Sequence, residues 1–212
     1  MPDLQTLLIW IIPILFAITL HEAAHGWVAS KFGDHTARMM GRVTLNPVKH
    51  IDPVGTILVP AVLLILSTGF IFGWAKPVPI NFNALRSPKS GMIWVALAGP
   101  GANLIMAIGW LFVFFLAIKM NIPILQRMAD AGILINILLA VFNLLPIPPL
   151  DGSRVISALL PNPLAYRYNQ LEQYGLFILI GLMYFGGFTK IVKPMVELVL
   201  SWFTYVLQVL IY

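Results

Sequence analysis

The chain has 212 residues, of which 59% are hydrophobic and only 10% are charged, and its mean hydropathy is +0.90. This composition excludes an ordinary soluble domain and indicates an all-α, multi-pass membrane protein. The net charge of +5 is not accompanied by the interleaved basic and aromatic residues of a nucleic-acid surface, and the absence of cysteine excludes disulfides and thiolate metal ligands.

The first predicted membrane helix covers residues 4–30, an apolar run too long for the core of a signal peptide. It contains His21, Glu22 and His25, although a carboxylate at the bilayer centre costs about 2.5–3.5 kcal/mol. Histidines four residues apart share a helical face and can bind one zinc ion, and a glutamate beside the first can act as a general base. Because Lys31 marks the helix end, His25 is expected about 9 Å inside one membrane face.

Residues 33–82 predict a re-entrant, partly β segment. Residues 42–45 are expected to form a short strand, and His35 and His50 are spare metal candidates. The apolar run at residues 56–72 is shorter than a spanning helix needs, so it either crosses the membrane or returns as a hairpin that turns near Gly69. The proline-rich stretch that follows is expected to be extended.

Two further core helices are predicted at residues 91–119 and 131–160. The first contains Asn103, a polar group that needs a partner. The second is interrupted by three prolines at positions 146, 148 and 149, directly before Asp151. Two accessory membrane helices, at residues 171–191 and 195–212, complete a single predicted domain of residues 1–212 with its catalytic core at 4–160.

Asp151 is the expected third zinc ligand, because it is the only other acid set within a broken apolar helix. It can reach the depth of the histidines only if residues 56–72 return to the face they left. The hairpin topology also places nine of the 13 basic residues on the metal side, against eight for a full crossing, which favours a site towards the cytoplasm. Residues 76–81 then lie beside the metal as an extended edge.

Three stretches together resemble the site-2 proteases, a family of intramembrane zinc metalloproteases, in its small prokaryotic form. They are HEAAH on the first helix, GPGAN on the second and NLLPIPPLDG at the break in the third, and FGWAKPVPIN is similar as well. No polar insertion is long enough for a PDZ or CBS domain. The resemblance implies one zinc ion held by His21, His25 and Asp151, with Glu22 as the base and Asn143 at the substrate carbonyl or its oxyanion. Supporting substrate contacts are expected from Asn103 and from Lys76, Pro77, Val78, Pro79, Ile80 and Asn81.

The expected activity is therefore zinc-dependent cleavage of transmembrane segments near the cytoplasmic face of a prokaryotic inner membrane. Its partners are a transmembrane protein or peptide substrate and the lipid bilayer, with no nucleic acid, and the sequence defines no oligomeric state. The alternative from another class is a zinc transporter or metal-binding membrane protein. Transport favours a row of ligands and two structural repeats, whereas this chain has one ligand cluster and no internal repeat.

Overall fold

The structure of the protein is a computed structural model that describes residues 4–65 and 73–211. Helices make up most of these residues, and no strand occurs among them. In chain order the helices are α1 (Leu4–Lys31), α2 (Thr36–Met39), α3 (Val59–Ile65), α4 (Pro88–Lys119), α5 (Pro123–Asn143), α6 (Asp151–Leu159), α7 (Asn162–Asn169), α8 (Gly175–Tyr184) and α9 (Lys193–Ile211). Shorter 3-10 or π-helical turns lie between several of them.

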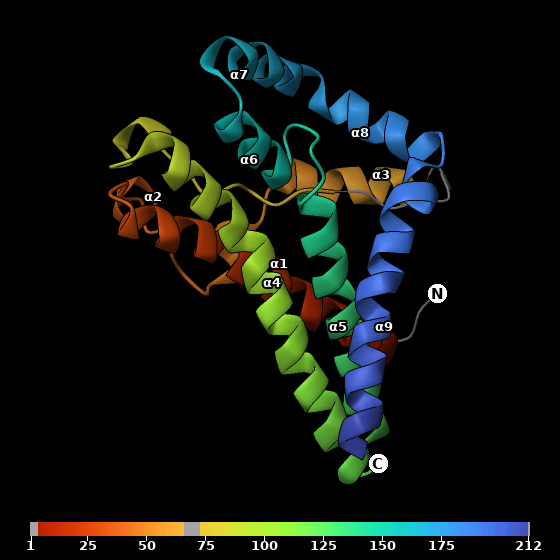
Figure 1. The fold of residues 1–212 in the computed structure, drawn as a ribbon. Coiled ribbons are helices and arrows are strands. Elements are labelled where there is room, and N and C mark those ends of the chain that lie inside the picture. The colour runs from red at the N-terminus through yellow and green to blue at the C-terminus, as the bar shows by residue number, and fades with distance from the viewer. Residues whose placement is uncertain (1–3, 66–72, 212) are drawn as a thin grey trace.

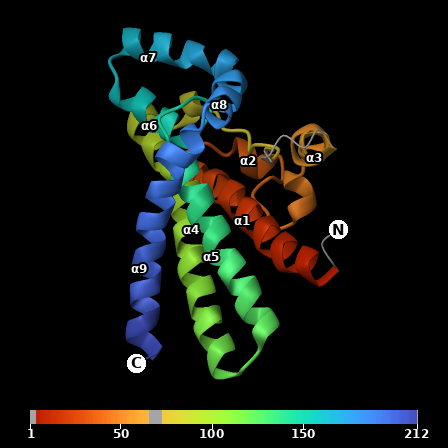
Figure 2. The ribbon, with the colours of Figure 1, turned by 90° about the vertical axis from the view of Figure 1, so that its right-hand side faces the viewer.

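Three helices are long and apolar enough to cross a membrane: α1, α4 and α5. α4 and α5 form an antiparallel pair joined by a tight turn in which Asn121 has a φ of 53°, and α1 crosses this pair obliquely (Figure 1). Figure 2 shows α9 running beside α4. The main apolar core lies where α4, α5 and the C-terminal helices meet, around Leu111, Ile137 and Val196. Many large apolar side chains remain exposed on α1 and α4, as expected for surfaces that face lipid. The protein is therefore a multi-pass, all-α membrane protein.

The third core helix differs from its predicted extent. It begins at Pro123, eight residues before the expected start. Its first turns contain the polar residues Gln126, Arg127 and Asp130, which in the sequence resemble a loop. Its predicted continuation to residue 160 is also wrong. α5 ends at Asn143, and a separate helix, α6, begins at Asp151 after the prolines.

The strand expected at residues 42–45 does not form. These residues make a bend, in which the Arg42 amide donates to Ala37 and the Arg42 side chain reaches the carbonyl groups of Lys76 and Pro77. Among the described residues no backbone hydrogen bond joins residues 42–45 to a neighbouring segment such as 76–81, so the ladder that a strand needs is missing. The partly β character expected for residues 33–82 is therefore wrong.

The two ends of the short apolar segment at residues 56–72 lie side by side. The amide of Trp74 donates to the Gly55 carbonyl at 3.1 Å, and the Thr56 hydroxyl donates to the Trp74 carbonyl at 2.9 Å. Such pairing excludes a full crossing, because its ends would be about 30 Å apart. The segment returns to where it began, although the turn expected near Gly69 lies outside the described residues.

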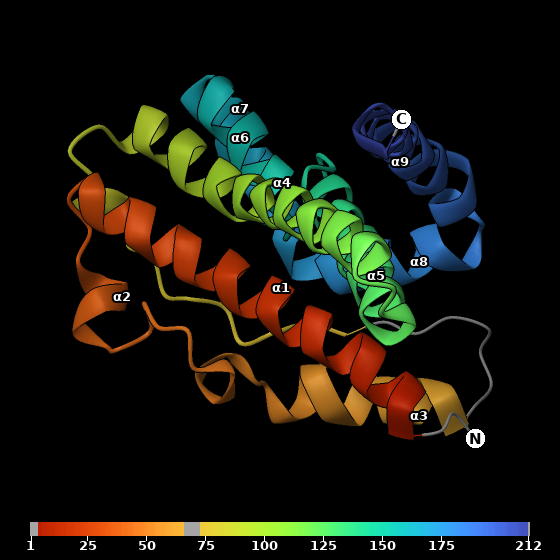
Figure 3. The ribbon, with the colours of Figure 1, turned by 90° about the horizontal axis from the view of Figure 1, so that it is seen from below.

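The C-terminal region differs from the two separate membrane helices expected there. α8 has only ten residues, and it is long enough to span only together with its neighbours as a broken pair, Asn162–Tyr184 and Phe188–Val209, bent by 76°. Gly186, with a φ of +73°, lies at the break. In Figure 3 α8 passes behind α5 and leads to α9.

Candidate metal centre

Two imidazoles lie one turn apart on α1. His21 and His25 are 8% and 6% exposed, and their Nε2 atoms are 3.1 Å apart. The i, i+4 spacing places them on one face of the helix, as the sequence predicts.

Asp151 is brought to the same place by the break after α5. The prolines at positions 146, 148 and 149 stop the helix, and Asp151 becomes the first residue of α6. Gly152 permits this arrangement, since a Cβ there would lie 2.2 Å from the Leu144 carbonyl oxygen. The Oδ2 atom of Asp151 lies 3.2 Å from Nε2 of His21 and 3.3 Å from Nε2 of His25.

The three facing atoms have the dimensions of a zinc site. Bonds of about 2.0–2.1 Å to a tetrahedral zinc ion place neighbouring ligand atoms about 3.3–3.4 Å apart, and the observed separations are 3.1, 3.2 and 3.3 Å. The Oδ2 atom of Asp151 is buried and accepts no hydrogen bond. His21, His25 and Asp151 form the only group of three or more metal-binding side chains in the part of the chain that the structure describes. Neither His35 nor His50 belongs to this group.

α4 carries no ligand of its own but fixes both imidazoles. Nδ1 of His21 donates to Oδ1 of Asn103 at 2.5 Å, and Nδ1 of His25 donates to the Val95 carbonyl at 2.7 Å. With both protons on Nδ1, the Nε2 lone pairs face Asp151, as a cation requires. Between these two acceptors, Gly99 lies so close that a Cβ would be 2.4 Å from His25 Nε2.

Asn103 is itself held by a second buried amide. Its Nδ2 donates to Oδ1 of Asn136 at 2.9 Å and to the Ala17 carbonyl at 3.3 Å, and Asn136 donates to the Gly132 carbonyl. Both asparagines are fully buried. All the hydrogen-bonding capacity of the Asn103 nitrogen is therefore used within the protein, and the structure gives this residue a role in orienting His21.

The carboxylate of Glu22 faces the extended stretch after the hairpin. Its Oε2 accepts a hydrogen bond of 2.8 Å from the backbone amide of Val78. Residues 76–81 thus lie beside the catalytic candidate. They form no helix or turn, and since residues before proline favour an extended backbone, we treat them as an extended segment along α1. Asn143 stands at the end of α5, half-buried, and its amide donates back to the Leu139 carbonyl at 2.9 Å.

The sequence alone does not single out Gly99 or Asn136 as residues of the site. In the sequence, close packing of helices is a sufficient reason for both glycines of GPGAN, yet Gly101, two residues after Gly99, has nothing within 4 Å of a Cβ placed there. Only the orientation of α4 towards α1 distinguishes the two glycines. For Asn136, an amide within an apolar helix was the available signal.

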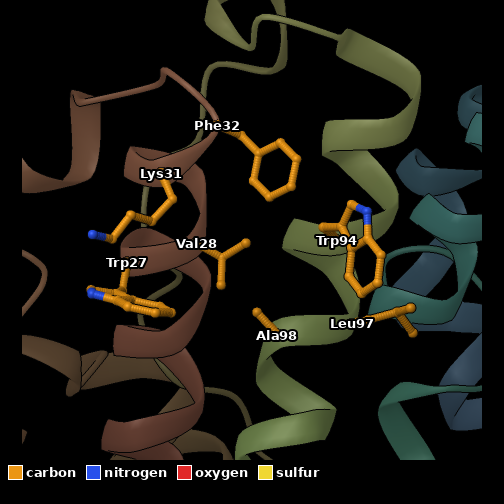
Figure 4. A pocket seen from close by; sticks show the side chains of 7 residues that line it. All are labelled: Trp27, Val28, Lys31, Phe32, Trp94, Leu97 and Ala98. Carbon is orange, nitrogen blue, oxygen red and sulfur yellow. The ribbon is translucent and has the colours of Figure 1, made fainter.

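An apolar groove of about 400 Å³ lies between α1 and α4. Val28, Phe32 and Ala98 line its interior, with Trp27 and Lys31 on the α1 side and Trp94 and Leu97 on α4 (Figure 4). It excludes the three metal-binding side chains. The chemistry therefore lies elsewhere on α1, at the face that α6 approaches.

A buried cluster of two histidines and one aspartate inside a membrane helix bundle, with a glutamate beside the first histidine, defines the class of membrane zinc hydrolases. The sequence model of peptidase family M50 matches residues 119–185. YwhC of Bacillus subtilis (strain 168), named as a candidate zinc metalloprotease, is 41% identical over 181 residues, which are 80% of this chain and 77% of the relative. The chain therefore belongs to peptidase family M50 and is a zinc metalloprotease of the site-2 type.

Other relatives carry similar names. Rip2 of Mycolicibacterium smegmatis, also named as a candidate zinc metalloprotease, is 31% identical over 173 residues, covering 80% of this chain and 64% of the relative. MJ0611 of Methanocaldococcus jannaschii, named in the same way, is 36% identical over 138 residues, covering 64% of this chain and 62% of the relative. No solved structure gives a significant match. Family membership favours the enzyme over the zinc transporter considered as its alternative.

Proposed function

We propose that the protein is an intramembrane endopeptidase that hydrolyses peptide bonds within transmembrane segments of other membrane proteins. The observation that carries this proposal is the position of the metal cluster. His21 and His25 lie within the apolar helix α1, which is long enough to span the bilayer. A protease whose ligands lie at that depth meets peptide bonds that are themselves within the membrane.

His21, His25 and Asp151 would hold the zinc ion. When bound, zinc lowers the pKa of its water towards about 7 and polarises the substrate carbonyl. Glu22 lies next to the first ligand on α1 and takes the proton from the attacking water. Its hydrogen bond to Val78 keeps one carboxylate oxygen pointing to the extended segment.

Substrate binding is assigned to residues 76–81 and Asn143. A helical peptide bond is shielded by its own turn, so the substrate must be extended before it is cut. The segment at 76–81 is itself extended and can pair with it as an edge strand. Asn143, with its amide at the end of α5, would donate to the substrate carbonyl as negative charge develops there.

The Glu22→Gln variant tests the activity. It removes the base and keeps a similar volume, so the purified variant should retain zinc and lose cleavage of a transmembrane substrate reconstituted in liposomes. Glu197→Gln is the matched control, because this exposed carboxylate pairs only with Lys193, one turn away on α9. Cleavage by Glu22→Gln at the parental rate would refute the assignment of the base.

The site is proposed to face the cytoplasm of a prokaryotic inner membrane, following the excess of basic residues on the metal side. Since the chain has no cysteine, single cysteines can report its orientation. Ser87→Cys, before α4, should react with an impermeant reagent added from the cytoplasmic side, and Met120→Cys, after α4, should react from the other side. The reverse pattern would overturn the orientation.

A further inference from the structure

The extended segment at residues 76–81 is held rigidly at both ends. At its start, the buried guanidinium of Arg42 donates to the carbonyl groups of Lys76 at 2.8 Å and Pro77 at 3.3 Å. At its end, the amide of Asn81 donates to the Asp34 carboxylate at 2.7 Å. Both anchors are buried residues close to the C-terminal end of α1, so the segment keeps a fixed position relative to the catalytic helix.

The middle of the segment packs directly on α1. Val78 is 6% exposed, and its Cγ1 atom would lie 3.0 Å from a Cβ built at Gly26, one turn after Glu22. Ile80 packs against the cluster that contains Ala29. The side chains of Val78 and Ile80 thus set the height of the backbone above the helix.

Because Pro77 and Pro79 have no N–H, the backbone donors of residues 76–81 are those of Lys76, Val78, Ile80 and Asn81. The amide of Lys76 donates to the His50 carbonyl at 2.9 Å and the amide of Asn81 donates to the Asp34 carboxylate at 2.7 Å, so only Val78 and Ile80 remain. In an extended chain residues i and i+2 present their N–H groups at the same edge. The two remaining donors, Val78 and Ile80, therefore share one edge, which is the edge at which Val78 reaches Glu22.

These two remaining donors differ in their partners. The amide of Val78 is already bonded to Glu22 Oε2 at 2.8 Å, whereas the amide of Ile80 donates to no protein group in the described structure. A substrate strand needs about 4.8 Å between backbones, which the direct contact between Val78 and Glu22 does not leave. One N–H cannot serve the base and a substrate strand in that geometry.

We propose that the backbone amide of Val78 is a positioning group for the general base, while the amide of Ile80 remains for the substrate. The edge is divided between two tasks: Val78 orients the Glu22 carboxylate, and pairing with substrate begins at Ile80. This inference rests on the proposed function, since it assigns parts of the same site. It makes the extended segment a component of the hydrolytic machinery as well as of substrate binding.

Amide-to-ester exchange at single positions tests the division, because it removes one N–H and keeps the side chain. The esters at positions 78 and 80 are prepared in the full-length protein and assayed in liposomes with a transmembrane substrate. The ester at 78 should lower kcat at least tenfold with KM within twofold of the parent. The ester at 80 should raise KM about fivefold, the loss of one ordinary hydrogen bond, with kcat little changed.

Genetic variants give a second route if an ester protein does not fold. Val78→Pro removes the same N–H and suits an extended chain between two prolines, whereas Val78→Ala keeps it. The kcat of Val78→Ala must exceed that of Val78→Pro by at least tenfold at equal zinc content.

The failure of this inference can be distinguished from failure of the proposed function. If loss of the amide at 78 raises KM and leaves kcat unchanged, the Val78 amide binds substrate and the division is wrong. If both esters behave as the parent while Glu22→Gln is inactive, the base stands and the positioning role is refuted. Cleavage by Glu22→Gln itself would instead refute the proposed function.

Discussion

Replacing Gly99 by alanine should destroy the metal site without removing any ligand. A Cβ at this position would lie 2.4 Å from Nε2 of His25 and 2.6 Å from Nε2 and Cε1 of His21. Non-bonded carbon atoms approach to about 3.5 Å at their optimum, so α4 or the rings must move by about 1 Å. The rings cannot turn away freely, because their Nδ1 atoms donate hydrogen bonds to Asn103 and Val95, which lie on α4 with Gly99.

The expected loss follows from the tolerance of metal coordination. Zinc ligand distances vary by only about 0.2 Å between sites, and a 1 Å displacement of a catalytic group costs about 100-fold in rate. The Gly99→Ala variant should therefore lose at least about 100-fold in zinc affinity, measured by competition with a chromogenic chelator. Its cleavage rate at fixed zinc should fall by a similar factor.

Gly101→Ala is the matched control on the same helix. Nothing lies within 4 Å of a Cβ at Gly101, so this substitution should leave zinc affinity unchanged and stabilise the helix by about 1 kcal/mol. Parental zinc affinity in Gly99→Ala would refute the steric argument. Equal losses in both variants would show that α4 responds to any substitution in this region.

Three further results are expected. Asn103→Leu removes the acceptor of the His21 Nδ1 proton, so zinc affinity should fall about 10–100-fold, measured by the same competition; an unchanged affinity would contradict the orienting role. Treatment with a chelator should abolish cleavage and lower the melting temperature, and added zinc should restore both; activity that persists without bound metal would contradict the zinc mechanism. Burial raises the pKa of Asp34, but hydrogen bonds from Thr36 and Asn81 outweigh it and lower the pKa below its ordinary value of 3.8. Asp34 therefore contributes stability that is present above its ordinary pKa of 3.8 and is lost as the pH falls through its lower pKa in the folded protein, so the melting temperatures of the parent and Asp34→Asn should differ at pH 7 and converge as the pH falls below 3.8.

The sequence predicts the metal ligands because each is marked by a pattern in its neighbouring residues. The spacing of His21 and His25 encodes a shared helical face, and the prolines before Asp151 show where an apolar helix must break. The same reasoning predicted the return of the hairpin from the need for these three groups to meet, and the contact between Gly55 and Trp74 confirms it. The ends of helices are harder to predict from the sequence, because the polar residues in the first turns of α5 resemble a loop.

The supports of the site could not be read from the sequence in the same way. Gly99 and Gly101 occur in one motif, and their difference depends on how α4 is rotated against a helix about 75 residues away in the chain. In the sequence, Arg42 and Asp34 resemble ordinary charged loop residues. Only the structure shows that they hold the two ends of the extended segment. The expected strand at residues 42–45 failed for the same reason, since residue preference alone supplies no partner strand.

α4 determines the geometry of a site to which it contributes no ligand. Val95, Gly99 and Asn103 follow one another at intervals of four residues, so they form a single stripe along one face of the helix. The Val95 carbonyl and the Asn103 side chain accept hydrogen bonds from His25 and His21. Gly99 between them leaves the space that the two rings occupy. Because the histidines on α1 repeat at the same interval of four, the two helices match turn for turn. A shift of α4 by one residue would move both acceptors away from the rings and fill the space at Gly99, so zinc binding depends on the packing of α1 against α4 as well as on the ligands.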